Sequence, residues 1–293
     1  MNNAALGITY GLVAMVCFGL MSVWYRPLTS RMNSIKISFY RNGFISVIFL
    51  LSFPFLPISR VEINNYLTPS IIYGLAIGFI GFLSQLTILK AVQKEKLGIV
   101  TPIANSAIAP TVLFSMIFFH ESLGGAGQLL AMLAILIGII LITINPKDIK
   151  TAGFRISAGV LYALATCLLW GIAFGWMKKP INIFGPILTS MTIEVSVFIY
   201  GAITMKIKGE SFSCPDGYCL KYLILIAVAA FIASLSVVFG YAAYKVNVVS
   251  ALFFSNPIVV AVYSYFIYKE KLSRLQLAAA TLIMAGIIGV CVL

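Results

Sequence analysis

Long apolar segments of similar length recur along the chain and alternate with short polar connections. A helix needs about 20 apolar residues to cross the hydrocarbon core of a membrane. The pattern therefore predicts an all-α integral membrane protein with ten transmembrane helices. No basic residue precedes the first segment, which we expect to be a span rather than a cleavable signal. The ten predicted spans are 4–25, 34–57, 67–89, 98–119, 126–144, 157–177, 183–205, 220–243, 248–268 and 275–293.

The composition supports the same fold class and leaves no room for a soluble domain. Of the 293 residues, 61% are hydrophobic and only 10% are charged, whereas about 25% are charged in soluble domains. The net charge of +12 comes from Lys and Arg residues that are scattered over the loops rather than gathered on one surface. We therefore expect the lipid bilayer as the partner and no nucleic acid. The pattern assigns no oligomeric state.

The distribution of Lys and Arg predicts the orientation of the chain. Most of the 20 lie in the loops that join spans 1–2, 3–4, 5–6, 7–8 and 9–10. The opposite loops hold only Arg60, Lys178, Lys179 and Lys245. Loops rich in Lys and Arg stay in the cytoplasm. The rule places both termini on the non-cytoplasmic side of what we expect to be a bacterial inner membrane.

The chain contains an internal repeat, which is a feature to look for before any motif. The segment GITYGLVAMVCFGLMSVW (7–24) aligns with GVLYALATCLLWGIAFGW (159–176) at an offset of 152 residues. The segment FFHESLGGAGQLLAMLAILIGII (118–140) aligns with IYKEKLSRLQLAAATLIMAGII (267–288) after a one-residue slip. Both alignments relate the first half of the chain to the second.

The repeat predicts two halves of opposite orientation in the membrane. Because each half has five helices, an odd number, the second half must enter the membrane from the other side. The halves are then related by a pseudo-twofold axis in the membrane plane, as in many secondary transporters with a substrate site near the midplane. Some inverted-repeat proteins are channels. The predicted parts are a first five-helix repeat at 1–145, a linker at 146–156 and a second five-helix repeat at 157–293.

The repeated motifs resemble those of the EamA-like family of the drug/metabolite transporter superfamily, over essentially the whole chain. Ala131 and Ala279 stand where that family usually has a glycine, which puts close helix packing there in question. The resemblance implies a polytopic carrier of small metabolites, often amino acids, that works by alternating access. The motifs are Phe18-Gly19 and Trp170-Gly171 on the first helix of each half, and Glu-x-Leu…Gln…Gly at Glu121, Leu123, Gln128 and Gly138 and at Glu270, Leu272, Gln276 and Gly286.

Two opposite charges lie deeper in the predicted spans than any others. The repeat relates Arg41 to Glu194 at an offset of 153 residues. A charge at membrane depth costs roughly 2.5–3.5 kcal/mol on insertion scales, so each should face the protein interior, a partner or water. Two hypotheses stay open: a buried ion pair between spans 2 and 7, or a substrate site. In a site, Arg41 would receive a carboxylate or phosphate, and Glu194 an amino group or a coupling proton.

Aromatic and amide side chains complete the candidate site. Aromatic residues can stack on a ligand or bind it through a hydrogen bond, but they also form packing contacts and interface belts. Two asparagines and several prolines lie in TPIANSAIAP (101–110) and SALFFSNP (250–257). These amides could contact substrate or join helices, and Gln85 is a weaker candidate of the same kind. The candidate substrate-binding residues are Arg41, Glu194, Tyr10, Tyr40, Tyr162, Trp170, Asn105 and Asn256.

These features predict a secondary, alternating-access transporter of small polar metabolites, amino acids or related zwitterions, with a central cavity between the repeats. The alternatives are an exchange carrier for another organic anion or a nucleotide-like metabolite, and a channel. His120 is the single histidine, and no nucleophile–base arrangement, metal-ligand cluster or Gly-rich phosphate loop is present. We therefore expect no enzyme activity, cofactor or metal. Cys214 and Cys219, around a Pro-Asp-Gly turn, are expected to be free thiols if their loop is cytoplasmic and could form a local disulfide if it faces out.

Overall fold

The computed structural model describes residues 3–95, 97–123, 125–143, 157–268 and 273–292, and within these ranges the chain is helical and has no strand. The prediction of an all-α fold is confirmed. The predicted linker, 146–156, lies outside the described residues. The helices are α1 (Asn3–Thr29), α2 (Ser34–Ser52), η1 (Phe53–Phe55), α3 (Arg60–Tyr66), α4 (Ile71–Lys94), α5 (Leu97–Asn105), α6 (Ile108–Phe119), α7 (Ala126–Thr143), α9 (Ala158–Trp176), α10 (Lys178–Ile207), α11 (Gly217–Ala243), α12 (Val246–Phe254), α13 (Pro257–Tyr268) and α14 (Arg274–Val292).

The fold is that of an integral membrane protein. Seven helical segments of the described chain are long and apolar enough to cross a membrane. Three shorter apolar helices occupy the remaining predicted ranges, at Ile103–Phe119, Ala126–Leu141 and Leu277–Val292. Large apolar side chains face outward along the helices; Leu50 is 73% exposed and Leu161 is 57% exposed. A continuous apolar exterior marks a membrane or protein contact rather than a surface in water.

The fourth and ninth predicted spans are each divided into two short helices. α5 ends at Asn105 before α6 begins at Ile108, and α12 ends at Phe254 before α13 begins at Pro257. Both breaks fall in the polar, proline-containing stretches that the sequence singled out. The second break has a local cause, because proline lacks an N–H group and suits only the first turn of a helix. The breaks place polar side chains, Asn105 and Asn256 among them, near the middle of the spans.

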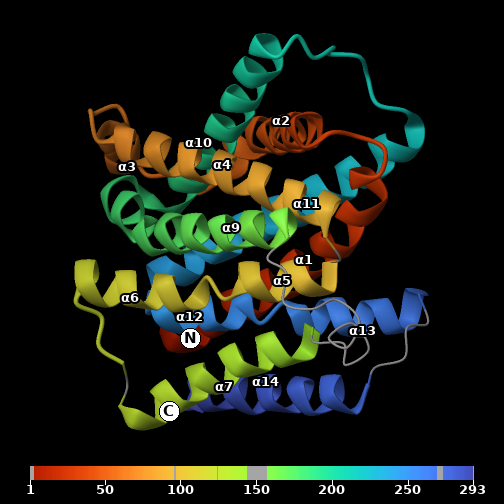
Figure 1. Ribbon diagram of the computed structural model, residues 1–293. Coiled ribbons are helices and arrows are strands. Elements are labelled where there is room, and N and C mark those ends of the chain that lie inside the picture. The colour runs from red at the N-terminus through yellow and green to blue at the C-terminus, as the bar shows by residue number, and fades with distance from the viewer. Residues whose placement is uncertain (1–2, 96, 124, 144–156, 269–272, 293) are drawn as a thin grey trace.

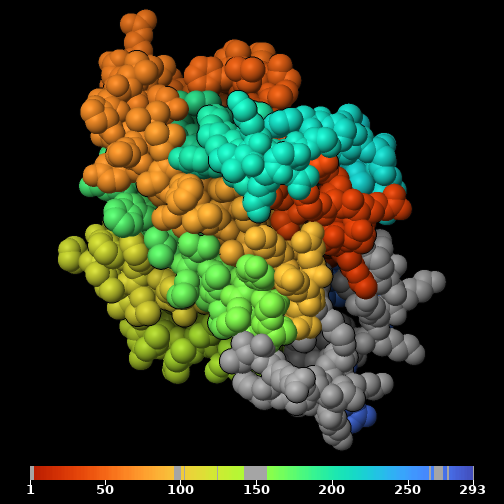
Figure 2. Space-filling model, turned by 45° about the horizontal axis from the view of Figure 1, so that its top comes forward, coloured from red at the N-terminus to blue at the C-terminus, as the bar shows by residue number. Residues whose placement is uncertain are grey.

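Helices of the two halves pack on each other in matched pairs. α1 lies along α11 and α9 lies along α4, while α2 packs on α10 and α7 on α14 (Figure 1). Each pair joins a helix of the first half to one of the second. Figure 2 shows the same interleaving on one face, where green residues of the second half lie between orange and yellow residues of the first. The core is therefore shared between the halves.

Glycines allow the closest of these contacts. Gly138 of α7 and Gly286 of α14 each pack against an isoleucine of the other helix, at 2.6 and 2.7 Å from where a Cβ would lie. The backbone carbonyls of Ala279 and Ala131 lie in the same two contacts. Small side chains bring helix backbones together in a membrane. The two helices therefore pack closely although alanine stands at both positions.

α10 is interrupted near its start. Phe184 and Gly185 have non-helical backbone angles, and Gly185 has φ 81° and ψ 166°, a conformation that favours glycine. The long helix that crosses the bundle therefore begins at Pro186, close to the predicted start at 183. The short helix α3, which the sequence did not predict, holds this break, because Asn65 Nδ2 donates a hydrogen bond to the carbonyl of Ile183 at 2.8 Å.

Candidate functional site

A cavity of about 170 Å³ lies between the two halves. Its lining comes from α1, α2, α4 and α5 of the first half and from α9, α10, α11 and α12 of the second, with one residue just beyond α9 and one just beyond α12. Described residues of α7 and α14 do not contribute. The two charged lining residues come from α2 and α10, and the phenylalanine and tryptophan side chains come from α1, α9 and α12. The cavity therefore has a charged region, on α2 and α10, and an aromatic region, on α1, α9 and α12.

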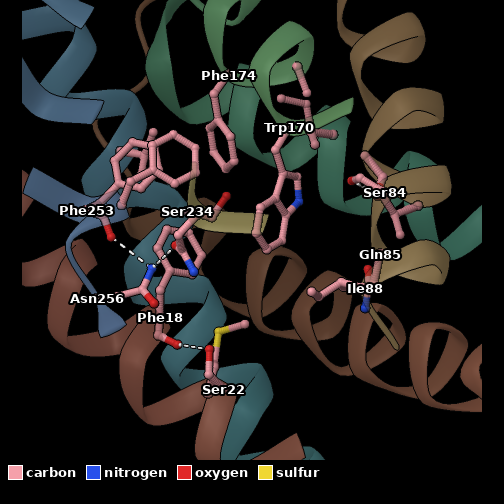
Figure 3. A pocket seen from close by; sticks show the side chains of 18 of the residues that line it. Phe18, Ser22, Ser84, Gln85, Ile88, Trp170, Phe174, Ser234, Phe253 and Asn256 are labelled. Carbon is pink, nitrogen blue, oxygen red and sulfur yellow. Dashed lines mark hydrogen bonds between the residues drawn. The ribbon is translucent and has the colours of Figure 1, made fainter. Parts of the chain in front are cut away.

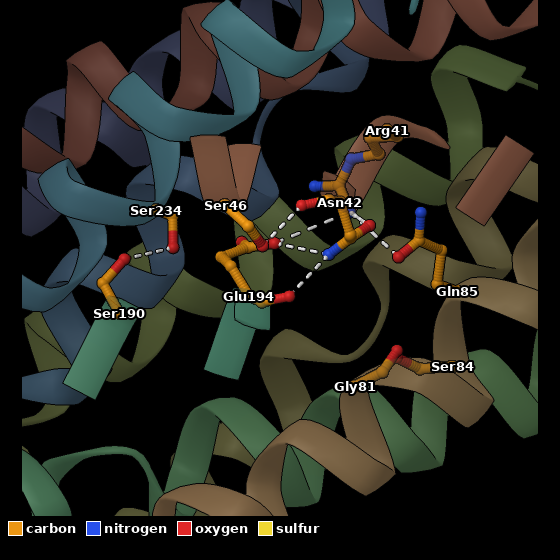
Figure 4. A network of polar contacts seen from close by, with 9 residues as sticks. All are labelled: Arg41, Asn42, Ser46, Gly81, Ser84, Gln85, Ser190, Glu194 and Ser234. Atoms are coloured by element: carbon orange, nitrogen blue, oxygen red, sulfur yellow. Dashed lines mark hydrogen bonds and ion pairs between the residues drawn. The ribbon is translucent and has the colours of Figure 1, made fainter. Parts of the chain in front are cut away.

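Arg41 and Glu194 face each other where α2 packs on α10 (Figure 4). Nη1 of Arg41 lies 3.9 Å from Oε2 of Glu194, which is too far for a hydrogen bond. Asn42 lies between them: its Oδ1 accepts from Arg41 Nη1 at 2.9 Å, and its Nδ2 donates to Glu194 Oε2 at 2.7 Å. Gln85 Oε1 accepts a second hydrogen bond from Nη1 at 2.9 Å. The two charges thus attract each other but are bonded through one neutral amide, that of Asn42.

The guanidinium of Arg41 has N–H groups that form no hydrogen bond with the described residues. Arginine carries five N–H groups, and the two on Nη1 are used by Asn42 and Gln85. Nε is buried with no partner among the described residues, and Nη2 forms no hydrogen bond with them. Nε and Nη2 together form the fork that binds a carboxylate or phosphate through two parallel hydrogen bonds. Arg41 is therefore buried, charged and still able to bind an anion.

Glu194 contacts α11 on its other side. Ser234 interacts with the carboxylate of Glu194, and its hydroxyl shares a 2.7 Å hydrogen bond with that of Ser190. Ser234 also lines the cavity. A buried carboxylate is tolerated only when hydrogen bonds or an opposite charge compensate its lost hydration. Glu194 has both kinds of compensation.

Gln85 and Ser234 occupy corresponding positions in the two halves. A glycine near the start of α1 contacts Gly240 of α11, and its counterpart on α9 contacts Ala91 of α4. The offset between these two contacts, 240 minus 91 or 149 residues, also takes Gln85 to Ser234. Each charge therefore has a neutral hydrogen-bonding residue at the same place on the corresponding helix, an amide beside the cation and a hydroxyl beside the anion.

Aromatic side chains form another part of the wall (Figure 3). The rings of Phe174 and Phe253 have centroids 4.9 Å apart, and those of Phe18 and Phe253 are 5.7 Å apart. Trp170 lies 6.4 Å from Phe254. Aromatic faces stack on apolar groups and attract cations. This wall suits the apolar part of a small amphipathic molecule.

Two amides join the helix breaks at the edge of the cavity. Asn256 Nδ2 donates to Asn105 Oδ1 at 2.7 Å and to the carbonyl of Phe253 at 2.9 Å. Asn105 Nδ2 donates to the carbonyl of Thr101 at 2.8 Å. Both asparagines are buried and line the cavity. They therefore bond the halves together and also border the space where a ligand would lie.

Comparison with known proteins identifies the family. The sequence profile of the EamA-like transporter family matches residues 5–144 and, a second time, residues 157–292. The chain belongs to the EamA-like transporter family. Two curated relatives from Helicobacter pylori, strains 26695 and J99, each described as an uncharacterized transporter, are 25% identical to it over 171 residues. That match covers 58% of this chain and 55% of the relatives, so the chain spans just over half their length.

A chain of known crystal structure has the same fold as this EamA-like transporter. It superposes with a TM-score of 0.78 over 97% of this chain and 95% of its own length, at 14% identity. At that identity the likeness concerns the fold alone.

The structure brings together part of the predicted site of this EamA-like transporter and places three tyrosines elsewhere. Tyr10 stacks on a phenylalanine of α11 at 5.7 Å, and the hydroxyl of Tyr40 donates to a backbone carbonyl in the loop before α11 at 2.8 Å. The ammonium of Lys90 lies 5.5 Å from the ring centroid of Tyr162. Helical spacing predicts which residues share a face but not their depth, and Tyr10 lies two turns before the first cavity residue of α1. The predicted residues that line the cavity are Arg41, Glu194, Trp170, Asn105 and Asn256.

Several lining or bridging residues were not predicted. Asn42 bonds to both charges, and its position next to Arg41 was the available signal. Ser234 could have been found from the offset of 149 residues, which relates Glu121 to Glu270 and also Gln85 to Ser234. Tyr25 lines the cavity close to Arg41 and Glu194. Each of these side chains is neutral, and a neutral side chain stands out less in an apolar span than a charge does.

The remaining reactive side chains lie apart from the cavity or do not cluster. No group of three His, Cys, Asp or Glu residues in the described chain could hold a metal ion. Cys214 and Cys219 are free thiols, the first exposed and the second buried. The carboxylate of Asp216 accepts a hydrogen bond from the backbone N–H of Cys219 at 2.7 Å. That bond caps the start of α11. The same bond and the nearby charge of Arg31 lower the pKa of the Asp216 carboxyl group.

Proposed function

We propose that this protein is a secondary transporter that works by alternating access, with ten transmembrane helices in two inverted five-helix halves. The two matches to one family profile support the duplication. The helix contacts support the symmetry, because exchanging the halves turns the α1–α11 pair into α9–α4 and the α2–α11 contact into α10–α4. Two near-equivalent halves around one cavity can rock to expose it to each side of the membrane in turn. We expect no catalytic step.

We propose small zwitterionic metabolites, amino acids among them, as substrates. The observation that carries this proposal is the unpartnered Nε–Nη2 fork of Arg41 in the same cavity as Glu194. Arg41 would receive the carboxylate, Glu194 the ammonium group, and the aromatic wall the apolar part. A zwitterion leaves the cavity neutral, whereas a nucleotide or other polyanion would add unbalanced charge at membrane depth, which is costly. The zwitterion is therefore favoured over the organic anion.

We also propose the orientation that the loop charges predict, with both termini on the non-cytoplasmic side of a bacterial inner membrane. The domain limits proposed are 1–145 and 157–293, joined by residues 146–156. A C-terminal reporter that functions only in the cytoplasm should remain inactive. An active reporter would show that the protein has the opposite orientation.

Ligand-induced stabilisation tests the substrate class. The probes are L-phenylalanine, its carboxylate-only analogue 3-phenylpropanoate and its amine-only analogue 2-phenylethylamine, added to the protein in nanodiscs. L-phenylalanine should raise the thermal midpoint most, because it carries both the carboxylate for Arg41 and the ammonium group for Glu194. A ligand at 100 times its Kd adds about 2.7 kcal/mol to the stability of the native state. Arg41→Gln should abolish the shifts with L-phenylalanine and 3-phenylpropanoate, and Glu194→Gln those with L-phenylalanine and 2-phenylethylamine.

The control for this measurement is Arg274→Gln, which removes an exposed arginine at the start of α14 and should leave every shift unchanged. Equal stabilisation of the wild type and Arg41→Gln by 3-phenylpropanoate would contradict the role given to Arg41.

A further inference from the structure

An uncharged amide separates the two charges of the cavity. Asn42 is fully buried and directly follows Arg41 on α2. Its oxygen accepts from the guanidinium of Arg41, and its nitrogen donates to the carboxylate of Glu194 and approaches the backbone carbonyl of Glu194 at 3.4 Å (Figure 4). The amide has one possible orientation here, because its nitrogen faces two acceptors and its oxygen faces a donor.

The amide takes the place of a direct hydrogen bond between the two charges. A charge-assisted hydrogen bond between a guanidinium and a carboxylate is about 2.7–2.9 Å long, shorter than the 3.9 Å between Nη1 of Arg41 and Oε2 of Glu194. Both N–H groups of Nη1 are already used by Asn42 and Gln85. Without the Asn42 side chain, the carboxylate of Glu194 would be the nearest acceptor for the released N–H group.

We propose that Asn42 is a positioning residue that keeps Arg41 and Glu194 from forming a direct, hydrogen-bonded ion pair, so that the Nε–Nη2 fork of Arg41 stays available to the carboxylate of the substrate. This inference rests on the zwitterionic substrate class proposed above. A direct pair through Nη1 would turn the guanidinium toward Glu194 and occupy the carboxylate that the ammonium group of the substrate needs, and the pair would have to break each time a substrate bound. With Asn42 in place, the substrate meets two separated charges.

An amide suits this position because it carries a donor, an acceptor and no charge. An aspartate at position 42 would pair with Arg41 itself and repel Glu194. A serine is too short to reach both groups at once. Asparagine satisfies one hydrogen bond of each charge and leaves the total charge of the cavity unchanged.

A double-mutant cycle without any ligand tests the separation. Thermal midpoints of the full-length protein in nanodiscs are measured for Arg41→Gln, Glu194→Gln and the double variant, first with Asn42 present and then in the Asn42→Ala background. Non-additivity of the midpoints measures the coupling of the two charges. The coupling should increase in the Asn42→Ala background, because a direct pair then forms. Unchanged or weaker coupling would show that Asn42 connects the charges and would overturn the proposal.

Binding of the probes supplies a second measurement. Asn42→Ala should weaken the binding of L-phenylalanine about tenfold, which corresponds to about 1.4 kcal/mol. The matched control is Ser46→Ala, one turn later on α2, whose hydroxyl bonds, among the described residues, only to the backbone carbonyl of Asn42 at 2.7 Å. This control should alter neither the coupling nor the affinity. If Asn42→Ala does not fold, Asn42→Ser replaces it in both measurements.

The two measurements separate failure of the inference from failure of the proposed function. A wild type that binds none of the three probes refutes the zwitterionic substrate class and with it the role of Asn42 in binding, while the cycle alone still decides whether Asn42 separates the charges. Stronger coupling with unchanged affinity for L-phenylalanine would overturn the role of Asn42 in substrate binding and leave the proposed function intact.

Discussion

The cavity places one cation and one anion among neutral polar side chains. Asn42 and Gln85 accept hydrogen bonds from Arg41, and Asn42 and Ser234 contact Glu194. Breaking a buried ion pair by removing one partner is strongly destabilising, because it leaves an uncompensated charge. The surrounding amides and hydroxyl reduce that dependence, since each charge keeps partners of its own. This arrangement explains how two ionisable groups persist in an apolar chain and still have capacity for a ligand.

We propose that a coupling proton binds to Glu194, the one carboxylate among the lining residues of the described chain. An inward proton gradient should stimulate uptake of labelled L-phenylalanine into proteoliposomes that contain the wild type. In Glu194→Gln any residual uptake should not respond to the gradient, because glutamine has a similar shape but no titratable group.

The control for the gradient experiment is Glu210→Gln, which removes a loop carboxylate that bonds to Asn33 and lies outside the cavity lining. This variant should respond to the gradient as the wild type does. Persistent stimulation in Glu194→Gln would mean that the coupling proton binds elsewhere.

The sequence could identify the charged residues of the site but not its complete lining. Internal symmetry related Arg41 to Glu194, because a charge in an apolar span stands out in both copies. The same offset relates Asn42 to Val195, an apolar residue, so symmetry gave Asn42 no partner. The tyrosines were proposed because they can stack on a ligand or bind it through a hydrogen bond, and this property carries no information on depth. Depth depends on how the helices of the two halves cross, and that is a property of the packed structure.

At the scale of helices, the carboxylate of Glu121 connects the α6–α7 loop to α10 and α12. Glu121, in the loop after α6, accepts hydrogen bonds from the backbone N–H groups of Val246 and Asn247 at 3.2 and 3.3 Å. It also pairs with Lys178 at the start of α10. The first turn of a helix has N–H groups without intrahelical partners and favours negative charge. Glu121 thus caps α12 and holds the α6–α7 loop against the other half.

Removing this cap should loosen the start of α12. Glu121→Ala should destabilise the protein by about 2 kcal/mol, since the change exposes helix N–H groups and leaves Lys178 without its carboxylate. Hydrogen exchange should become faster at the amides of Val246 and Asn247. Lys178→Met should have a smaller effect at these amides, because it leaves the cap in place.

The matched control is Lys179→Met, because Lys179 lies 5.8 Å from the ring centroid of Tyr73 and does not contact Glu121. It should leave exchange at both amides unchanged. Unaltered protection in Glu121→Ala would contradict the capping role.

The helices themselves were largely predictable, for a physical reason. Membrane spans require long apolar runs, so the sequence located each apolar range, and the prolines marked the breaks at α5–α6 and α12–α13. α3 was not predicted, because its seven residues mix polar and apolar side chains within a connection. Its contacts with the interrupted start of α10 join segments far apart in the chain, and no local pattern reports such a contact.

At the scale of the whole molecule, the cavity is built from corresponding helices of both halves, and no described residue of α7 or α14 lines it. These two helices pack on each other (Figure 1). The glycines of that outer pair fix a close contact between the halves. The inner helices carry the charges, the aromatic wall and the two helix breaks. We infer that the outer pair acts as a scaffold, while motion of the inner helices exposes the cavity alternately to each side.

Counterflow in proteoliposomes tests this account most directly. Vesicles that contain the protein are loaded with unlabelled L-phenylalanine and diluted into a trace of labelled L-phenylalanine. A carrier with alternating access should accumulate label transiently above its equilibrium level. Arg41→Gln should lose this overshoot, and Arg274→Gln should keep it. Entry of label to equilibrium without an overshoot in the wild type would indicate a channel and contradict the account.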